Sequence, residues 1–148
     1  MSAKSKQAVK RFKKGFNCSQ AVLSIYSEQF GLDCEKAFKV ATGFGSGMRM
    51  GGTCGAVSGA FMVLGLKYGN TTAKDKAGKA KTYKKVEEYT NRFKARNDSV
   101  TCRELLGCDL STPEGTKEAK DKGLFSSICP RMVQDAVEIL EEMLAGDS

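Results

Sequence analysis

The sequence contains no histidine and no tryptophan, and only two prolines among its 148 residues. The absence of histidine excludes Ser-His-Asp and Cys-His nucleophile systems, histidine-ligated zinc, and haem attached through a Cys-x-x-Cys-His motif. Any chemistry must therefore use cysteine, carboxylate, lysine, tyrosine or backbone groups. The chain has six cysteines, a density well below that of small disulfide-stapled secreted domains.

The chain also lacks a long apolar run. Its longest uncharged stretch, residues 50–66, contains five glycines, whereas a membrane-spanning helix needs about 20 predominantly apolar residues. The basic N-terminal residues are not followed by an apolar segment, so we expect no secretory signal and no membrane association. We expect a cytoplasmic protein, in which cysteines stay reduced or hold metal more often than they form static disulfides.

The net charge of +7 is unevenly distributed. Residues 1–14 carry six Lys or Arg and no acid, and residues 67–96 carry ten against three acids. Such segments are typical of solvated helix faces, and they also attract acidic partners. No nucleic-acid-binding motif accompanies them, so nucleic acid is not an expected partner.

Cap residues and apolar residues at helical spacing predict helices throughout the chain. We expect one helix ending at Gly15, then helices from Asn17 to Gly31, from Asp33 to Gly43, over roughly residues 54–67, from Thr71 or Thr72 to about Ala95, after Ser99 or Thr101, after Thr112, and from Cys129 onward. No segment alternates with the period of two that is typical of a strand. The prediction is an all-α, compact helical bundle forming a single domain over residues 1–148.

Two of these helices have distinctive compositions. The helix at 54–67 is hydrophobic on all sides, which predicts a buried, central position. Its small residues Gly55 and Gly59, four apart, predict close packing against another backbone. The lysine-rich helix has an expected buried stripe, which consists of Ala80, Tyr83, Val86, Thr90 and Phe93.

Four cysteines fall in the first turns of different predicted helices: Cys18, Cys54, Cys102 and Cys129. A helix start presents unpaired N–H groups and about half a positive charge, which lowers the pKa of a thiol. If these four starts converge, they form one pocket suited to a thiolate-ligated cluster or a set of reactive thiols. Cys34 shares this local position, whereas Cys108 follows Gly107 at a predicted helix end.

A glycine-rich loop, residues 43–52, precedes the central helix. It lacks the third glycine of Gly-x-Gly-x-x-Gly and the Gly-Lys-Ser/Thr of a P-loop, so a nucleotide site is not expected. Its glycines allow the backbone to approach a cofactor or thiol site closely. We therefore expect Gly45, Gly47 and Gly52 to contact a cofactor, and Arg49 to neutralise a thiolate or an anion.

The sequence resembles the C_GCAxxG_C_C family of redox-active proteins over roughly residues 5–145. The matching segments are Asn17–Leu23, Gly51–Gly59, Cys102–Leu106 and Cys129–Pro130. The central segment has Thr-Cys-Gly-Ala where the family name has Gly-Cys-Ala, so only Cys54 is carried over from it. The resemblance implies a redox role for the four cysteines. A related domain occurs in split-Soret cytochromes c, but without Cys-x-x-Cys-His we expect no haem here.

We therefore expect an iron–sulfur cluster ligated by Cys18, Cys54, Cys102 and Cys129, which transfers electrons to a redox partner protein. Three alternatives stay open: a metal-free thiol–disulfide oxidoreductase, a non-enzymatic interaction module with structural cysteines, and zinc held by the same thiolates. The sequence does not decide whether the protein is an enzyme, and it leaves a homodimer open.

Overall fold

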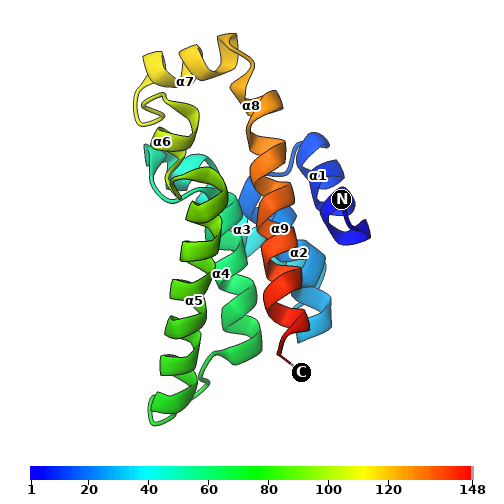
Figure 1. Cartoon of the computed structure of the whole chain (residues 1–148). Helices are drawn as coiled ribbons and strands as arrows, with labels where there is room; N and C mark the ends of the chain where they lie inside the picture. The colour runs from blue at the N-terminus through cyan, green and yellow to red at the C-terminus, as the bar shows by residue number, and fades with distance from the viewer. Residues whose placement is uncertain (148) are drawn as a thin grey trace.

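The structure is a computed structural model that describes residues 1–147, and within them it contains helices and no strand (Figure 1). The α-helices are α1 (Ala3–Lys13), α2 (Cys18–Ser27), α3 (Cys34–Ala41), α4 (Gly55–Tyr68), α5 (Lys76–Asn97), α6 (Cys102–Leu106), α7 (Pro113–Asp121), α8 (Leu124–Ser127) and α9 (Cys129–Ala145). Three short helical turns lie between them: η1 (Glu28–Phe30), η2 (Thr42–Phe44) and η3 (Gly47–Gly51). The all-α prediction is confirmed. Along the described residues, no helix has the length and apolarity to cross a membrane.

Helix α4 lies at the centre, packed against α2, α5 and α9. Helix α1 packs on α2 and α9, and α3 packs on α2. The short helices α6, α7 and α8 form an arch at the upper end of the bundle in Figure 1. The core is built from apolar side chains of α2, α4 and α9, including Leu23, Leu64 and Leu140. The first residues of α2, α4, α6 and α9 lie toward the end that the arch covers.

The predicted close approach at Gly55 and Gly59 occurs between α4 and α2. A Cβ atom added at Gly59 would lie 2.8 Å from the carbonyl oxygen of Ser19, and one added at Gly55 would lie 3.1 Å from the Ser19 nitrogen. These distances leave no room for a side chain larger than hydrogen at Gly59. The two helices therefore pack backbone to backbone, next to Cys18 and Cys54.

Helix α5 departs from the prediction. It begins at Lys76, capped by Asp75, rather than at Thr71 or Thr72. Ala80 and Tyr83 of the expected stripe are exposed, Tyr83 by 59%, whereas Tyr89 and Phe93 are buried. The first turns of α5 protrude at the lower end of the bundle, where no other helix covers them (Figure 1). Apolar spacing alone cannot show how far a neighbouring helix extends.

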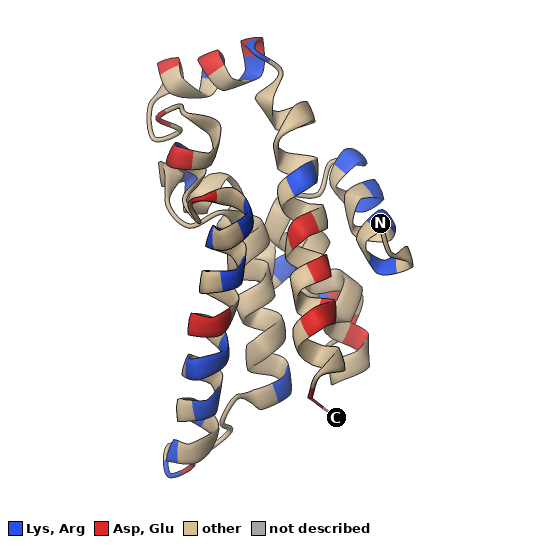
Figure 2. Cartoon of the chain, in the orientation of Figure 1, with Lys and Arg blue, Asp and Glu red and all other residues tan. Residues whose placement is uncertain are grey.

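The basic face of α5 is partly neutralised by acidic residues of α9. Lys and Arg lie along α5, and Asp and Glu lie along the neighbouring face of α9 (Figure 2). The Arg96 guanidinium lies 3.3 Å from the carboxylate of Asp135, 3.0 Å from that of Glu138 and 2.8 Å from that of Glu142. This part of the basic segment therefore joins two helices.

The segment predicted as a glycine-rich loop contains a left-handed turn. Ser46, Met48 and Arg49 have φ values of 54°, 59° and 62°, a region that residues with side chains rarely occupy. Gly47 has the same conformation, and a Cβ there would lie 2.4 Å from the nitrogen of Gly52. The Gly52 N–H closes the turn by donating to the Gly47 carbonyl at 3.0 Å. Composition predicted a tight turn here but not its handedness.

Candidate functional site

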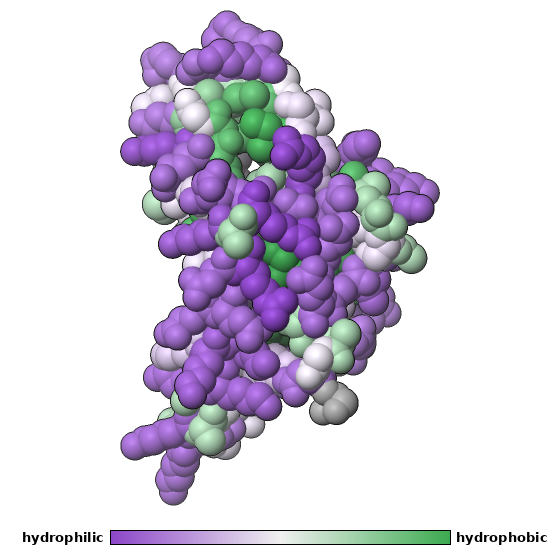
Figure 3. All heavy atoms as spheres, viewed as in Figure 1, coloured by the Kyte–Doolittle hydropathy of each residue, from purple (hydrophilic) through white to green (hydrophobic). Residues whose placement is uncertain are grey.

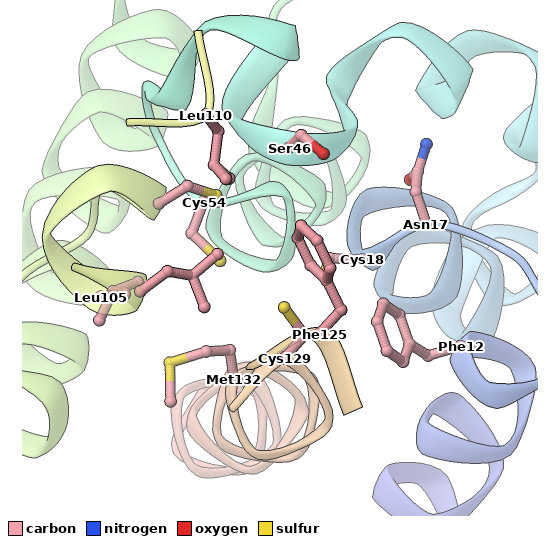
Figure 4. Close-up of a pocket in the computed structure, with 12 residues that line it drawn as sticks. Phe12, Asn17, Cys18, Ser46, Cys54, Leu105, Leu110, Phe125, Cys129 and Met132 are labelled. Atoms are coloured by element: carbon pink, nitrogen blue, oxygen red, sulfur yellow. The ribbon is translucent and has the colours of Figure 1, made fainter. Parts of the chain in front are cut away.

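The four helix-start cysteines line one pocket. Cys18, Cys54, Cys102 and Cys129 border a cavity of about 80 Å³ beneath the arch (Figure 4). Cys18, Cys102 and Cys129 are the first residues of α2, α6 and α9, and Cys54 is the cap residue that precedes α4. The sequence left open whether these four helix starts converge, and in the structure all four cysteines line one pocket.

A short antiparallel bridge places Cys54 beside Cys102. Thr53 and Thr101 pair in this bridge. The Cys54 N–H donates to the Val100 carbonyl at 2.7 Å, and the Cys102 N–H donates to the Gly52 carbonyl at 2.8 Å. The two residues therefore leave the same bridge and enter different helices. Sequence reasoning missed this contact, although a Thr-Cys dipeptide occurs at both positions.

Side-chain caps fix the start of α2, which holds Cys18. The Asn17 side chain accepts a hydrogen bond from the Gln20 N–H, and the Gln20 side chain accepts one from the Asn17 N–H, both at 2.9 Å. This reciprocal capping box satisfies two N–H groups that a helix start leaves free. The Asn17 amide also donates to the Thr42 carbonyl at 2.9 Å, which ties the start of α2 to the end of α3.

The pocket thiols shift one another's pKa values. Cys54 is linked in this way to Cys102 and Cys18, and Cys18 is also linked to Cys129. Hydrogen bonds from Cys102 and Cys18 hold the pKa of the Cys54 thiol well below its usual range, and the N–H groups of Ala56 and Val57 add to this effect. These contributions outweigh burial, which alone would raise the pKa. Among the pocket thiols, Cys54 is therefore the one whose pKa is lowered.

The neighbouring thiols behave in the opposite way. The hydrogen bonds of Cys18 with Cys129 and Cys54, together with burial, raise its thiol pKa. The hydrogen bond with Cys54 and burial raise the pKa of Cys102. The expectation that every helix start lowers the pKa of its cysteine is thus wrong for these two residues. A thiol that donates to a neighbouring thiolate is stabilised in its protonated form.

The remaining lining is mostly apolar. Side chains from α6, the arch and α9 surround the sulfur atoms in Figure 4; they include Leu105, Leu106, Leu110, Phe125 and Met132. Asn17 and Ser46 are the other polar residues that line the cavity. Cys54 is only 3% exposed. Chemistry at these thiols therefore takes place in a poorly hydrated environment, where charge interactions are strong.

The predicted loop residues lie next to this pocket without lining it. Ser46 lines the cavity, whereas Gly45, Gly47, Arg49 and Gly52 do not. A Cβ at Gly45 would lie 2.9 Å from the Cβ of Asn17, so this glycine lets the loop pack on the cap of α2. Gly52 holds Cys102 through its carbonyl, and Arg49 is exposed. Contact of these residues with a cofactor stays a prediction.

The two other cysteines lie outside the thiol pocket. Cys34 is half-buried at the start of α3, and its sulfur lies 3.8 Å from the Arg11 guanidinium. Cys108 is buried near Glu118, where burial raises its thiol pKa. Neither residue lines the pocket.

The pocket does not have the arrangement of a single-ion site. Among residues 1–147, no three cysteine, aspartate or glutamate side chains are disposed to hold one metal ion. The four thiols instead line the cavity from four separate helix starts.

The comparison with known proteins agrees with the placement of the cysteines. A family model described as "Putative redox-active protein (C_GCAxxG_C_C)" matches residues 16–143. The chain belongs to this family. The matched segment includes Cys18, Cys54, Cys102 and Cys129, so the family resemblance drawn from their motifs is confirmed. No curated protein and no solved structure matches the chain. Family membership supports a redox-active role based on cysteine.

Proposed function

We propose that the four-cysteine pocket binds an iron–sulfur cluster and that the protein transfers electrons to a redox partner. The observation that supports this proposal is the convergence of four thiols, from four separate helix starts, around one cavity. Four cysteine thiolates are the usual ligands of such clusters, which supply one-electron chemistry when bound. Reduced thiols persist in the cytoplasm, where we infer that the protein acts.

The residues around the cavity suit this donor set. The cavity of about 80 Å³ is several times larger than the space that one water molecule needs. Backbone N–H groups of Ala56, Val57 and Gly55 donate to the sulfur atoms of Cys54 and Cys102. Such hydrogen bonds stabilise negative charge on sulfur and raise the reduction potential of a bound centre. Binding requires the thiols to turn from one another toward the cavity, which rotation about χ1 allows.

Anaerobic purification followed by assays of iron and acid-labile sulfide tests this function. We expect both elements in the wild-type protein, loss of both in Cys102→Ser, and retention in the matched control Cys34→Ser, which changes a cysteine outside the pocket. Circular dichroism verifies that each variant is folded. A folded wild-type protein without iron and sulfide refutes the proposal, and so does equal loss in Cys34→Ser.

The convergence of the four thiols on one cavity also supports a second candidate, metal-free thiol–disulfide exchange. The Cys54 thiolate attacks a disulfide and forms a mixed disulfide, releasing one thiol of the substrate. Cys102 or Cys18 then attacks the Cys54 sulfur, which releases the second thiol and leaves a disulfide in the protein. The substrate gains two electrons and two protons, and the protein loses them.

Mass spectrometry after differential alkylation separates this candidate from the first. Thiol–disulfide exchange predicts a reversible disulfide between Cys54 and Cys102 or Cys18 in oxidised, metal-free protein. The reduced form regains all free thiols. If no cysteine pair responds to oxidant and reductant, the second candidate is refuted.

A further inference from the structure

A second cavity adjoins the thiol pocket. It is a cleft of about 400 Å³ between the C-terminal end of α5, α6 and the start of α9. Polar and charged residues line it, namely Arg96, Asn97, Asp98, Ser99, Glu104 and Arg131. The cleft shares two lining residues, Leu105 and Met132, with the thiol pocket. These two side chains therefore form a partition between the cavities.

The two cavities have opposite polarity. The cleft is open and its polar lining includes Asn97, Arg131 and the carboxylates of Asp98 and Glu104, whereas the thiol pocket is small and lined mainly by apolar side chains. In Figure 3 hydrophobic residues gather beneath α7 and are bordered by hydrophilic ones. A molecule in the cleft can keep its polar groups hydrated or hydrogen-bonded. The direct way from the cleft to a sulfur atom lies between Leu105 and Met132.

The partition lies next to the reacting groups. Leu105 belongs to the same short helix as Cys102, and Met132 lies one helical turn after Cys129 in α9. Leu105 is partly exposed, while Met132 is 4% exposed and has a flexible, unbranched side chain. A rotamer change at these two residues opens the wall without moving a helix.

We propose that the polar cleft is the entrance to the thiol pocket and that Leu105 and Met132 form its gate. The geometry points to a small amphipathic reactant, with a hydrogen-bonding head that stays in the cleft and an apolar reactive end that passes the gate. This inference rests on the proposed redox role of the four thiols. It adds the route by which a reactant reaches them.

Alkylation kinetics of the reduced, cluster-free protein test the entrance. The probe is N-ethylmaleimide, and mass spectrometry follows modification of Cys18, Cys54, Cys102 and Cys129. Met132→Ala and Leu105→Ala are expected to react roughly tenfold faster, which corresponds to removal of about 1.4 kcal/mol from the cost of opening. The matched control is Leu32→Ala, which makes the same truncation as Leu105→Ala at a partly buried position that lines neither cavity. Its alkylation rate should stay near that of the wild type.

Two further measurements keep the test decisive if truncation destabilises the fold. Leu105→Phe adds bulk at the gate and should slow alkylation severalfold, an effect that unfolding cannot produce. Iodoacetate, which is charged at its reactive end, should be retarded more than N-ethylmaleimide when each rate is divided by its rate with free glutathione. Equal acceleration by Leu32→Ala and by the gate variants, no slowing in Leu105→Phe, or equal retardation of both reagents overturns the proposal. The alkylation rates are measured on cluster-free protein and do not depend on iron content. A failure of the iron–sulfur proposal is therefore recognised separately, by the iron and sulfide assay.

Discussion

Replacement of Gly59 by alanine tests whether the backbone contact between α4 and α2 holds the site together. The added Cβ would lie 2.8 Å from the Ser19 carbonyl oxygen, whereas a carbon–oxygen contact needs about 3.3 Å. The helices must therefore separate by roughly 0.5 Å, and overpacking of this kind costs about 1–3 kcal/mol. Alanine also gains about 0.5–1 kcal/mol of helix propensity over glycine.

Gly65→Ala in the same helix is the matched control for this prediction. A Cβ at Gly65 meets no other group within 4 Å, so this variant gains the helix propensity of alanine without a steric clash. Urea denaturation of both variants at one pH should place Gly59→Ala about 1–3 kcal/mol below Gly65→Ala. Because Cys18 precedes Ser19, the same separation should weaken the Cys18–Cys54 contact and slow disulfide formation between these residues. Equal stability of the two variants would refute the argument that the backbones of α4 and α2 are too close at Gly59 to admit a side chain.

Three further predictions concern the site. The pKa of Cys54 is lowered, so ultraviolet titration of the metal-free protein should show one thiolate forming below the ordinary thiol value of about 8.5, and Cys54→Ser should lack it. The pKa values of Cys18 and Cys102 are raised in the folded protein, so on raising the pH the unfolded chain releases these protons at a lower pH than the folded protein does. The free energy of unfolding should therefore fall as the pH rises above about 8.5, and it should fall less steeply in Cys102→Ser. Asn17→Ala should lower the free energy of unfolding, measured by urea denaturation, by about 1 kcal/mol because it removes the capping box. If this loss is no greater than that caused by an alanine substitution at a surface position that caps no helix, the capping role is contradicted.

Local sequence signals predicted most helix starts because they act within one turn of the chain. Asn17, Asp33, Thr101 and Thr112 each accept a hydrogen bond from a backbone N–H at the start of the helix that they cap. Such contacts need no information about distant residues. The caps Asn17 and Thr101 placed Cys18 and Cys102 in first turns. The glycine-rich loop and Pro130 did the same for Cys54 and Cys129.

Features that depend on distant parts of the chain could not be predicted in the same way. Burial of α5 was misassigned because its first turns extend past the helices that cover Tyr89 and Phe93. The Thr53–Thr101 bridge joins segments 48 residues apart, and no local signal specifies their pairing. Helix α8, which the sequence did not predict, is a four-residue turn following Gly123 and has no side-chain cap.

The position of each cysteine within its first turn explains why one thiol differs from its neighbours. Cys54 is the cap residue of α4, which brings its thiol near the N–H groups of Ala56 and Val57, and these groups help to lower its pKa. Cys18 and Cys102 are the first residues inside their helices, where Asn17 and Thr101 already occupy the cap. Interaction with neighbouring thiols, together with burial, raises the pKa of both, although the Gly55 N–H opposes this rise at Cys102. A shift of one residue along the helix therefore accompanies the opposite pKa shifts of Cys54 and its neighbours, and this asymmetry serves a ligand set and a nucleophile equally well.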